Sequence, residues 1–405
     1  MNVKGEYVIA HMADLHLGYT YTSKTNAQGI NWREVDGYRA MDECVSQIIE
    51  DGSVDVVIIA GDLFHVFAPP PRAIIFAQRQ LRRFADAGLP VYSIAGNHDQ
   101  SDIRAEIAAS AVVDDRERGI WSHAEPYAVH EILPDVYLHM VSHHLFSQQA
   151  QTMDEVKPRK GAINILTAHG TMVDPETREA IRSEALTPRE VLIPSEMIEE
   201  GWDYCLLGHI HERRYVGSSG RVLYNGSLVR RGFSDGVTSL GRGWTKWTLH
   251  ADGTMTPEFK TVWQRPQHDL PLIDAKNLSV DDIDERIIGN LKQGLSGSHD
   301  DTDAPILRQR IINISPAKKR SLDMTKIAPL SKQALSWNLR TSTIEETEQA
   351  DEGKAADMGG SVSDRYNAWL GTSEAYKGVE ESLKDDVAAS TKRYIDQGQE
   401  DTLDE

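Results

Sequence analysis

The most constraining feature of this sequence is a set of polar clusters, each placed directly after a short apolar run. Gly96-Asn97-His98-Asp99 follows the apolar residues 89–95, a run that is typical of a buried strand. Four more clusters follow apolar runs in the same way: Asp14-Leu15-His16, Gly61-Asp62-Leu63-Phe64-His65, Ala168-His169-Gly170 and Gly208-His209-Ile210-His211. Ligands of open α/β sheets bind at the carboxyl ends of the strands. The pattern therefore predicts an α/β fold whose site collects donors from several strand ends.

Strand and helix patterns alternate in the first part of the chain and give way to hairpins later. Strands are predicted over residues 7–13, 54–59, 89–95, 135–142, 162–168 and 204–207. Apolar residues at helical spacing predict a helix over residues 36–50, and Pro69-Pro70-Pro71 is typical of the start of a second helix. Hairpins are predicted over residues 215–224 and 244–262. Together these elements predict a sandwich of two sheets flanked by helices.

The character of the sequence changes near residues 264–268, where we place a domain boundary. Residues 1–265 form the first predicted domain. Residues 266–340 combine a capped helix start at 278–282, a strand at 306–315 and a helix at 321–335. They predict a small α/β cap domain.

The last predicted segment, residues 341–405, is an acidic and partly helical tail. It holds 17 acidic and 6 basic residues, a balance of −11 that leaves −8 of the total charge of −19 for the rest of the chain. Two apolar stripes at helical spacing lie in it, formed by Tyr366, Trp369 and Leu370 and by Val379, Leu383 and Val387. Such stripes favour helices that dock on a partner; a disordered solubilising tail is the alternative. Because much of the negative charge lies in this tail, the net charge does not exclude DNA binding, which needs only a local basic face.

The composition is that of a globular protein without disulfides or membrane spans. Hydrophobic residues make up 40% of the chain, and every apolar run is far shorter than the roughly 20 residues of a membrane helix. The N-terminal residues lack the apolar region of a secretory signal. The two cysteines, Cys44 and Cys205, are expected to pack in cores. We therefore expect a cytoplasmic protein that does not bind membranes.

The polar clusters contain donors that suit a pair of divalent cations. Asp14 and His16 are two residues apart, a spacing that in a strand places both side chains on one side. The Asp62 carboxylate can bridge two ions. The remaining donors are the amide of Asn97 and the imidazoles of His169, His209 and His211. This mixture of oxygen and nitrogen favours Mn²⁺, Fe²⁺ or Zn²⁺ over Ca²⁺. Two ions about 3.5–4 Å apart can activate a bridging water and clamp a phosphate.

In their order, the clusters resemble those of the calcineurin-type metallophosphoesterase superfamily, and the SbcD nuclease branch within it. The resemblance covers about the first 265 residues and continues more loosely to about residue 340. It implies one ion held by Asp14, His16, Asp62 and His211, and a second held by Asp62, Asn97, His169 and His209.

The resemblance also implies catalytic roles for three further side chains. His98 would stabilise the transition state or protonate the leaving oxygen, and Asp99 would orient His98. His65 would lie near the scissile phosphate. It marks the nuclease branch, because many phosphomonoesterases of the superfamily carry Asp at this position.

The implied function is that of the nuclease subunit of a complex of the SbcC–SbcD type, which processes DNA double-strand breaks. Exonuclease and endonuclease activities, DNA as substrate, an SbcC-like coiled-coil ATPase as partner and a homodimer are expected. Mn²⁺ is the expected metal, with Mg²⁺, Fe²⁺ and Zn²⁺ as alternatives. Two other functions stay open: a phosphodiesterase or phosphatase acting on nucleotides or phosphoproteins, and a scaffold that binds a partner.

Several basic and histidine pairs have two interpretations each. His143-His144 matches no motif, and we expect it to be structural or to lie at the rim of the site. Arg213-Arg214 and Arg230-Arg231 either face solvent or contact phosphates. Residues Arg308, Arg310, Lys318, Lys319 and Arg320 of the cap domain form either a solvated face or a surface for the DNA backbone.

Overall fold

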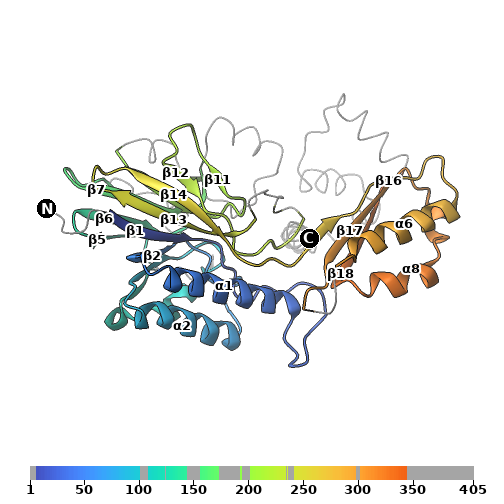
Figure 1. The fold of residues 1–405 in the computed structure, drawn as a ribbon, viewed down its shortest axis with the longest axis horizontal. Coiled ribbons are helices and arrows are strands. Elements are labelled where there is room, and N and C mark those ends of the chain that lie inside the picture. The colour runs from blue at the N-terminus through green and yellow to red at the C-terminus, as the bar shows by residue number, and fades with distance from the viewer. Residues whose placement is uncertain are drawn as a thin grey trace, which may run out of the picture. The chain divides into compact units, whose positions relative to one another are not determined.

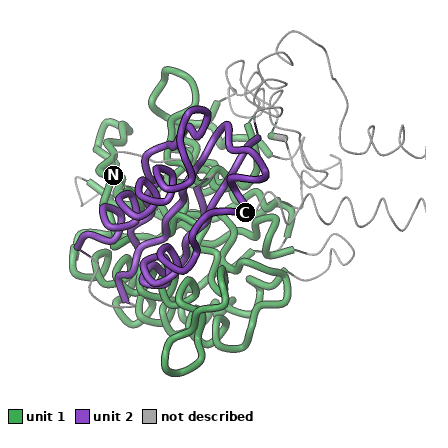
Figure 2. Tube along the Cα trace, turned by 90° about the vertical axis from the view of Figure 1, so that its right-hand side faces the viewer, with its two compact units in different colours: residues 1–231, 235–264 green, residues 232–234, 265–405 purple. Residues whose placement is uncertain are grey.

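The computed structural model describes residues 6–100, 108–123, 125–143, 156–172, 192–193, 201–233, 235, 241–297 and 302–343. His144 and the predicted tail helices lie outside these residues. The chain divides into two compact units (Figure 2). The larger unit comprises Met1–Arg231 and Asp235–Gln264, and the smaller comprises Gly232–Ser234 and Arg265–Glu405.

The first sheet of the larger unit has six strands in the order β14-β13-β1-β2-β3-β4. Their bounds are β1 (Glu6–Met12), β2 (Val56–Ile59), β3 (Val91–Ile94), β4 (Ile120–His123), β13 (Gly243–His250) and β14 (Met255–Thr261). Strands β1 to β4 are parallel, and the β13–β14 hairpin joins β1 in antiparallel register. The polar clusters after β1, β2 and β3 therefore meet at one edge of this sheet.

Two long helices cover one face of the first sheet, α1 (Trp32–Asp51) and α2 (Pro71–Asp86) (Figure 1). The predicted start of α1 at residue 36 is four residues late, because the side chain of Asn31 caps the helix by accepting the N–H of Arg33 at 2.9 Å. Helix α2 begins at Pro71, as the proline triplet predicted. Along β1, Val8 and Ala10 pack toward the helices and Ile9 packs toward the second sheet.

The second sheet also has six strands, in the order β11-β12-β10-β7-β6-β5. Their bounds are β5 (Tyr127–Leu133), β6 (Val136–Val141), β7 (Ile163–His169), β10 (Tyr204–Gly208), β11 (Arg214–Tyr215) and β12 (Val222–Tyr224). Shorter elements are β8 (Thr171–Met172), β9 (Leu192–Ile193) and the 3₁₀ turns η1 (Ala109–Val113) and η2 (Arg116–Arg118). An apolar core with Ile9, Ile58 and Leu206 joins the two sheets, so the predicted sandwich flanked by helices is confirmed.

The smaller unit is a sheet built around β17 (Ile306–Ile312), with parallel partners β15 (Gln267–Asp269), β16 (Ile273–Asp274) and β18 (Ser336–Thr341). Its helices are α6 (Val280–Gly294), α7 (Pro316–Arg320) and α8 (Met324–Ser331). A capping box between Ser279 and Asp282 starts α6, as its sequence predicted. The helix expected over residues 321–335 is the shorter α8, and α7, which lies before that range, was not predicted. Strand β18 was missed, because its residues lack a long apolar run.

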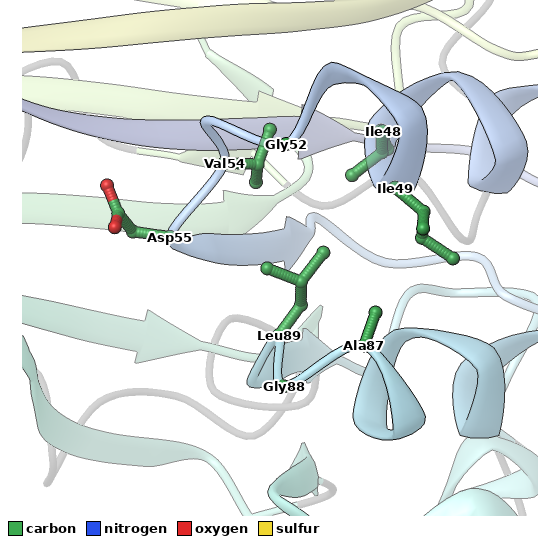
Figure 3. Close-up of a pocket in the computed structure, with 8 residues that line it drawn as sticks. All are labelled: Ile48, Ile49, Gly52, Val54, Asp55, Ala87, Gly88 and Leu89. Carbon is green, nitrogen blue, oxygen red and sulfur yellow. The ribbon is translucent and has the colours of Figure 1, made fainter.

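The ends of β2 and β3 opposite the polar clusters form a cavity of about 270 Å³ with the ends of α1 and α2 (Figure 3). Ile48, Val54 and Leu89 are among the apolar residues that line it. Among the described residues that line it, Asp55 is the ionisable one, and its Oδ2 already accepts the N–H of Val8 at 2.8 Å. The two ends of the sheet therefore differ in character, and the metal-type donors gather at the carboxyl end.

Candidate metal centre

The donors after β1 and β2 lie on two sharp turns that run side by side. Asp14, His16 and Asp62 have φ angles of 52°, 45° and 51°, in the left-handed region that non-glycine residues seldom adopt. The N–H of Asp14 donates to the Gly61 carbonyl at 3.1 Å, and that of His16 donates to the Asp62 carbonyl at 3.0 Å. The expectation that Asp14 and His16 share one side of a strand is wrong, because β1 ends at Met12. These side chains are brought together by the two turns and not by the alternation of side chains along a strand.

Two glycines allow the ligand-bearing loops to approach closely. A Cβ atom on Gly96 would lie 2.1 Å from Oδ1 of Asp62, and one on Gly61 would lie 2.3 Å from Nδ1 of His169. Both contacts are far shorter than any side chain tolerates. The glycines of Gly-Asp and Gly-Asn-His-Asp are therefore required by the packing of the donors themselves.

A first group of donors consists of Asp14, His16 and His211, whose ligand atoms lie within 4.8 Å of one another. Nε2 of His16 lies 3.0 Å from Nε2 of His211, and Nε2 of His211 lies 3.9 Å from Oδ1 of Asp14. Two nitrogen ligands at about 2.1 Å from one ion are separated by about this distance. The geometry therefore fits one divalent cation.

A second group surrounds His169 at the end of β7. Its Nε2 lies 2.9 Å from Oδ1 of Asn97 and 3.3 Å from Oδ2 of Asp62. Nδ1 of His209 lies 3.1 Å from the same Asn97 oxygen. Oδ2 of Asp62 also lies 3.6 Å from Nε2 of His16, whereas Oδ1 accepts the N–H of His98 at 2.9 Å. One carboxylate oxygen thus reaches both groups, and the structure brings all seven predicted donors together.

Hydrogen bonds behind the donors hold the imidazoles in suitable tautomers. Nδ1 of His169 donates to the Ala60 carbonyl at 2.9 Å, which leaves the lone pair of Nε2 for a metal. Nδ1 of His211 lies 3.1 Å from Oδ1 of Asp235, which sequence reasoning missed. Asp235 follows no apolar run and belongs to none of the five clusters, so no local signal marks it.

The structure corrects the expected role of Asp99. Its buried carboxylate accepts the backbone N–H groups of Leu63 at 3.1 Å, Phe64 at 2.9 Å and Gly96 at 3.1 Å. His98 is held instead by the carbonyl oxygen of His65, which lies 2.7 Å from its Nδ1. Asp99 therefore ties the Asp62 turn to the Asn97 loop and does not orient His98.

Three other histidines lie beside the donors. The ring of His65 stacks on that of His98 at 5.1 Å between centroids. The nitrogens of His16, His65 and His98 form a third group within 4.8 Å of one another, so a metal at that position is a rival arrangement. The ring of His143 lies 6.3 Å from that of His169, at the edge of the site.

Burial and mutual charge shift the pKa values of the donors in opposite directions. Burial holds the pKa of His16 and of His209 well below the ordinary value. Burial alone would also lower the pKa of His169, but the carboxylates of Asp62 and Asp14 outweigh it and raise this pKa to about 9. The pKa of Asp14 is raised by burial, whereas His169 and His98 overcome burial at Asp62 and hold its pKa well below normal. Buried carboxylates among mostly neutral imidazoles favour the binding of cations.

The fold and these donors define a metal-dependent phosphoesterase, and the chain belongs to the calcineurin-like phosphoesterase family, whose model matches residues 7–213. The predicted superfamily is confirmed. The chain is similar to the DNA double-strand break repair protein Mre11 of Archaeoglobus fulgidus, with 38% identity over 92 residues that cover 23% of this chain and 19% of that protein. It is 25% identical to Mre11 of Sulfurisphaera tokodaii over 243 residues, 58% of each chain. The chain thus spans less than two thirds of either relative.

Two solved structures superpose weakly on the chain. The protein TT1561 of Thermus thermophilus has a TM-score of 0.36 at 12% identity, covering 62% of this chain and 98% of that one. A dimetal phosphatase from Danio rerio has a TM-score of 0.36 at 10% identity, covering 64% of this chain and 97% of that one.

In the part of the chain that the structure describes, no helix is both long and apolar enough to cross a membrane.

Proposed function

We propose that the protein is a two-metal DNA nuclease that hydrolyses phosphodiester bonds. The observation that carries this proposal is the position of Asp62, whose Oδ2 lies 3.6 Å from Nε2 of His16 and 3.3 Å from Nε2 of His169. A single oxygen between two donor groups suits a bridged pair of ions. The choice of DNA as substrate is supported by the repair function in the names of the Mre11 relatives.

The proposed ion sites follow the two groups of donors. Asp14, His16, Asp62 and His211 would hold the first ion, and Asp62, Asn97, His169 and His209 would hold the second. Mn²⁺ is the proposed metal, and Mg²⁺, Fe²⁺ and Zn²⁺ are alternatives. When bound, such a pair supplies a water of lowered pKa and neutralises charge on the phosphate.

His98 is proposed to exchange a proton with the leaving oxygen. Its Nδ1 is bonded to the His65 carbonyl, so the free nitrogen is Nε2. Burial lowers the pKa of His98, so this nitrogen is neutral before substrate binds. A phosphate anion beside the ring favours the protonated form, which can then act as the general acid. His65 stacks on the ring and limits its movement.

The smaller unit and the tail are proposed to select the substrate and the partner. Residues 266–340 are proposed as a DNA-binding cap, and residues 341–405 as the docking segment for an SbcC-like coiled-coil ATPase. A homodimer is also proposed. A two-metal centre cleaves whichever phosphodiester reaches it, so specificity for DNA has to come from surfaces outside the centre.

One experiment separates this function from its alternatives. The same Mn²⁺-loaded preparation is given duplex DNA, bis-p-nitrophenyl phosphate and p-nitrophenyl phosphate, and bound metal is measured. We expect two ions per chain and turnover of both diesters well above that of the monoester. A preference for the monoester would favour a phosphatase. A chain that binds no metal and hydrolyses none of the three would favour the partner-binding scaffold.

A further inference from the structure

Arg231 lies against the metal centre with part of its guanidinium group unused. Its Nη2 lies 3.2 Å from Nδ1 of His211. Its Nη1 is buried and, among the residues that the structure describes, has no hydrogen-bond partner. A buried cationic donor without an acceptor is costly and uncommon, so such a group calls for an explanation.

The backbone of Arg231 is held on both sides, so the guanidinium does not sit on a free loop. Its N–H donates to Oδ2 of Asp235 at 2.7 Å. Its carbonyl accepts the hydroxyl of Tyr19 at 3.1 Å. The Tyr19 ring in turn lies 4.9 Å from the ring of His65, so the same contacts connect Arg231 to the site.

Nδ1 of His211 cannot form hydrogen bonds with both of its neighbours at once. It lies 3.1 Å from Oδ1 of Asp235 and 3.2 Å from Nη2 of Arg231. A histidine that binds a metal through Nε2 is neutral and carries its proton on Nδ1. That proton is donated to Asp235, so Nδ1 cannot accept from Arg231. When His211 binds a metal, both terminal nitrogens of Arg231 therefore lack an acceptor among the residues that the structure describes.

We propose that Arg231 binds the non-bridging oxygens of the substrate phosphate at the metal centre. This inference rests on the proposed phosphodiesterase function. The two terminal nitrogens form the planar fork that matches a phosphate, and such charge-assisted pairs are among the strongest hydrogen bonds of proteins. Asp235 contacts His211 and the backbone N–H of Arg231, and no hydrogen bond between it and the Arg231 guanidinium is found among the described residues.

The electrostatics of the site agree with an anion at this position. After burial, the charge of Arg231 is the next cause that lowers the pKa of His16, and it also contributes to the lowered pKa values of His65 and His98. Its field therefore reaches His16, His65 and His98. A positive field there attracts the phosphate.

The test compares Arg231→Gln and Arg231→Lys with the full-length wild-type chain. Arg82→Gln is the matched control, because Arg82 is an exposed cation on α2 of the same unit. Binding of inorganic phosphate to the Mn²⁺-loaded protein is measured by calorimetry, and bound Mn²⁺ is counted for each variant. We expect Arg231→Gln to weaken phosphate binding about 10- to 100-fold. Arg231→Lys should lose less, and Arg82→Gln should lose nothing. All variants should keep the wild-type metal content.

The outcomes separate this inference from the proposed function. Unchanged phosphate affinity in Arg231→Gln, with diester hydrolysis intact in the wild type, would overturn the inference alone. Loss of Mn²⁺ from Arg231→Gln would also overturn it, since Arg231 would then support His211 instead of substrate. A wild-type chain that binds phosphate through Arg231 but hydrolyses no diester would support the anion site and overturn the proposed function.

Discussion

The two units use charged side chains in opposite ways. In the larger unit, Asp14 and Asp62 are almost completely buried among histidines, and Arg231 keeps a buried nitrogen without a partner among the described residues. In the smaller unit, most of the described charged side chains are exposed, and several of them form ion pairs. Arg308 donates to Asp269 at 2.8 Å, and Lys326 lies 3.1 Å from Asp323. Buried charges with few counter-charges are typical of a reactive site, whereas exposed ion pairs are typical of a solvated surface.

The contacts of the smaller unit also reduce the number of cations that are available on the surface proposed to bind DNA. Arg310 lies 3.7 Å from Asp269, and Nζ of Lys318 donates to the Leu278 carbonyl at 2.7 Å. With Arg308 also paired, the most available of the five basic residues proposed for DNA are Lys319 and Arg320 of α7, both exposed. Exposed ion pairs contribute about 0–1 kcal/mol, so the paired residues add little stability while reducing the charge offered to phosphates.

The largest effect is expected from replacing Asp62, the carboxylate that lies between the two donor groups of the buried centre. Asp62→Asn should abolish hydrolysis of DNA and of bis-p-nitrophenyl phosphate, because a neutral amide cannot bridge two cations. Bound Mn²⁺, measured by elemental analysis, should fall from two ions to one or none. Full metal content with full turnover would show that the ligand assignment is wrong.

His98→Gln tests chemistry separately from metal binding. The kcat for DNA should fall by about 10²–10⁴, the usual effect of losing an acid–base group, with Mn²⁺ content unchanged. The readouts are single-turnover kinetics and elemental analysis of the same sample. If the ions are lost instead, the third group of His16, His65 and His98 holds a metal and the role of His98 has to be reassigned.

Asp235→Asn tests whether the carboxylate behind His211 supports the metal. The half-buried Asp235 stabilises the Nδ1–H tautomer, so its loss should weaken binding of one Mn²⁺ about 10- to 100-fold. Titration calorimetry of the metal-free chain measures this, and Asp252→Asn, an exposed turn residue, is the control. Equal affinities for wild type and Asp235→Asn would mean that the tautomer needs no carboxylate.

The pH dependence of metal loading tests the ion pair of Asp62 and His169. The pKa of His169 is raised to about 9, so the metal-free protein holds a proton there at neutral pH. A ligand has to be neutral, so one proton leaves when metal binds, and apparent Mn²⁺ affinity should rise about tenfold per pH unit from pH 7 toward 9. In the metal-free chain, the stabilisation from this pair is lost as the pH rises through about 9. A flat affinity profile would contradict the prediction.

The smallest expected effect concerns the surface of the smaller unit. Replacing Lys319 and Arg320 together by Gln should reduce the salt dependence of DNA binding by about two phosphate contacts. Hydrolysis of bis-p-nitrophenyl phosphate should stay unchanged. Arg308→Gln is the control, because its charge is already paired with Asp269. An equal loss in the control, or no loss in the double variant, would remove α7 from the proposed DNA surface.

Much of the fold and the donor set could be predicted because both have local signals. Apolar runs of strand length and helical spacing identify the elements that build the sandwich. The clusters lie where parallel strands end, and parallel strands bring their carboxyl ends to one edge. The order of Asp62, Asn97 and the histidines was therefore enough to predict which side chains meet, without knowing how the chain turns between them.

Other features of the site depend on contacts between distant parts of the chain. The left-handed turns at Asp14 and Asp62, the bonding of Asp99 to three backbone amides, and the contacts of Arg231 and Asp235 with His211 have no local pattern. His211 and Asp235 are 24 residues apart, and Asp14 and His209 are 195 apart. A strand end has a signature in the few residues around it, whereas a hydrogen bond between distant loops depends on how all the intervening elements pack. The local sequence therefore identifies the donors, and packing decides what holds and surrounds them.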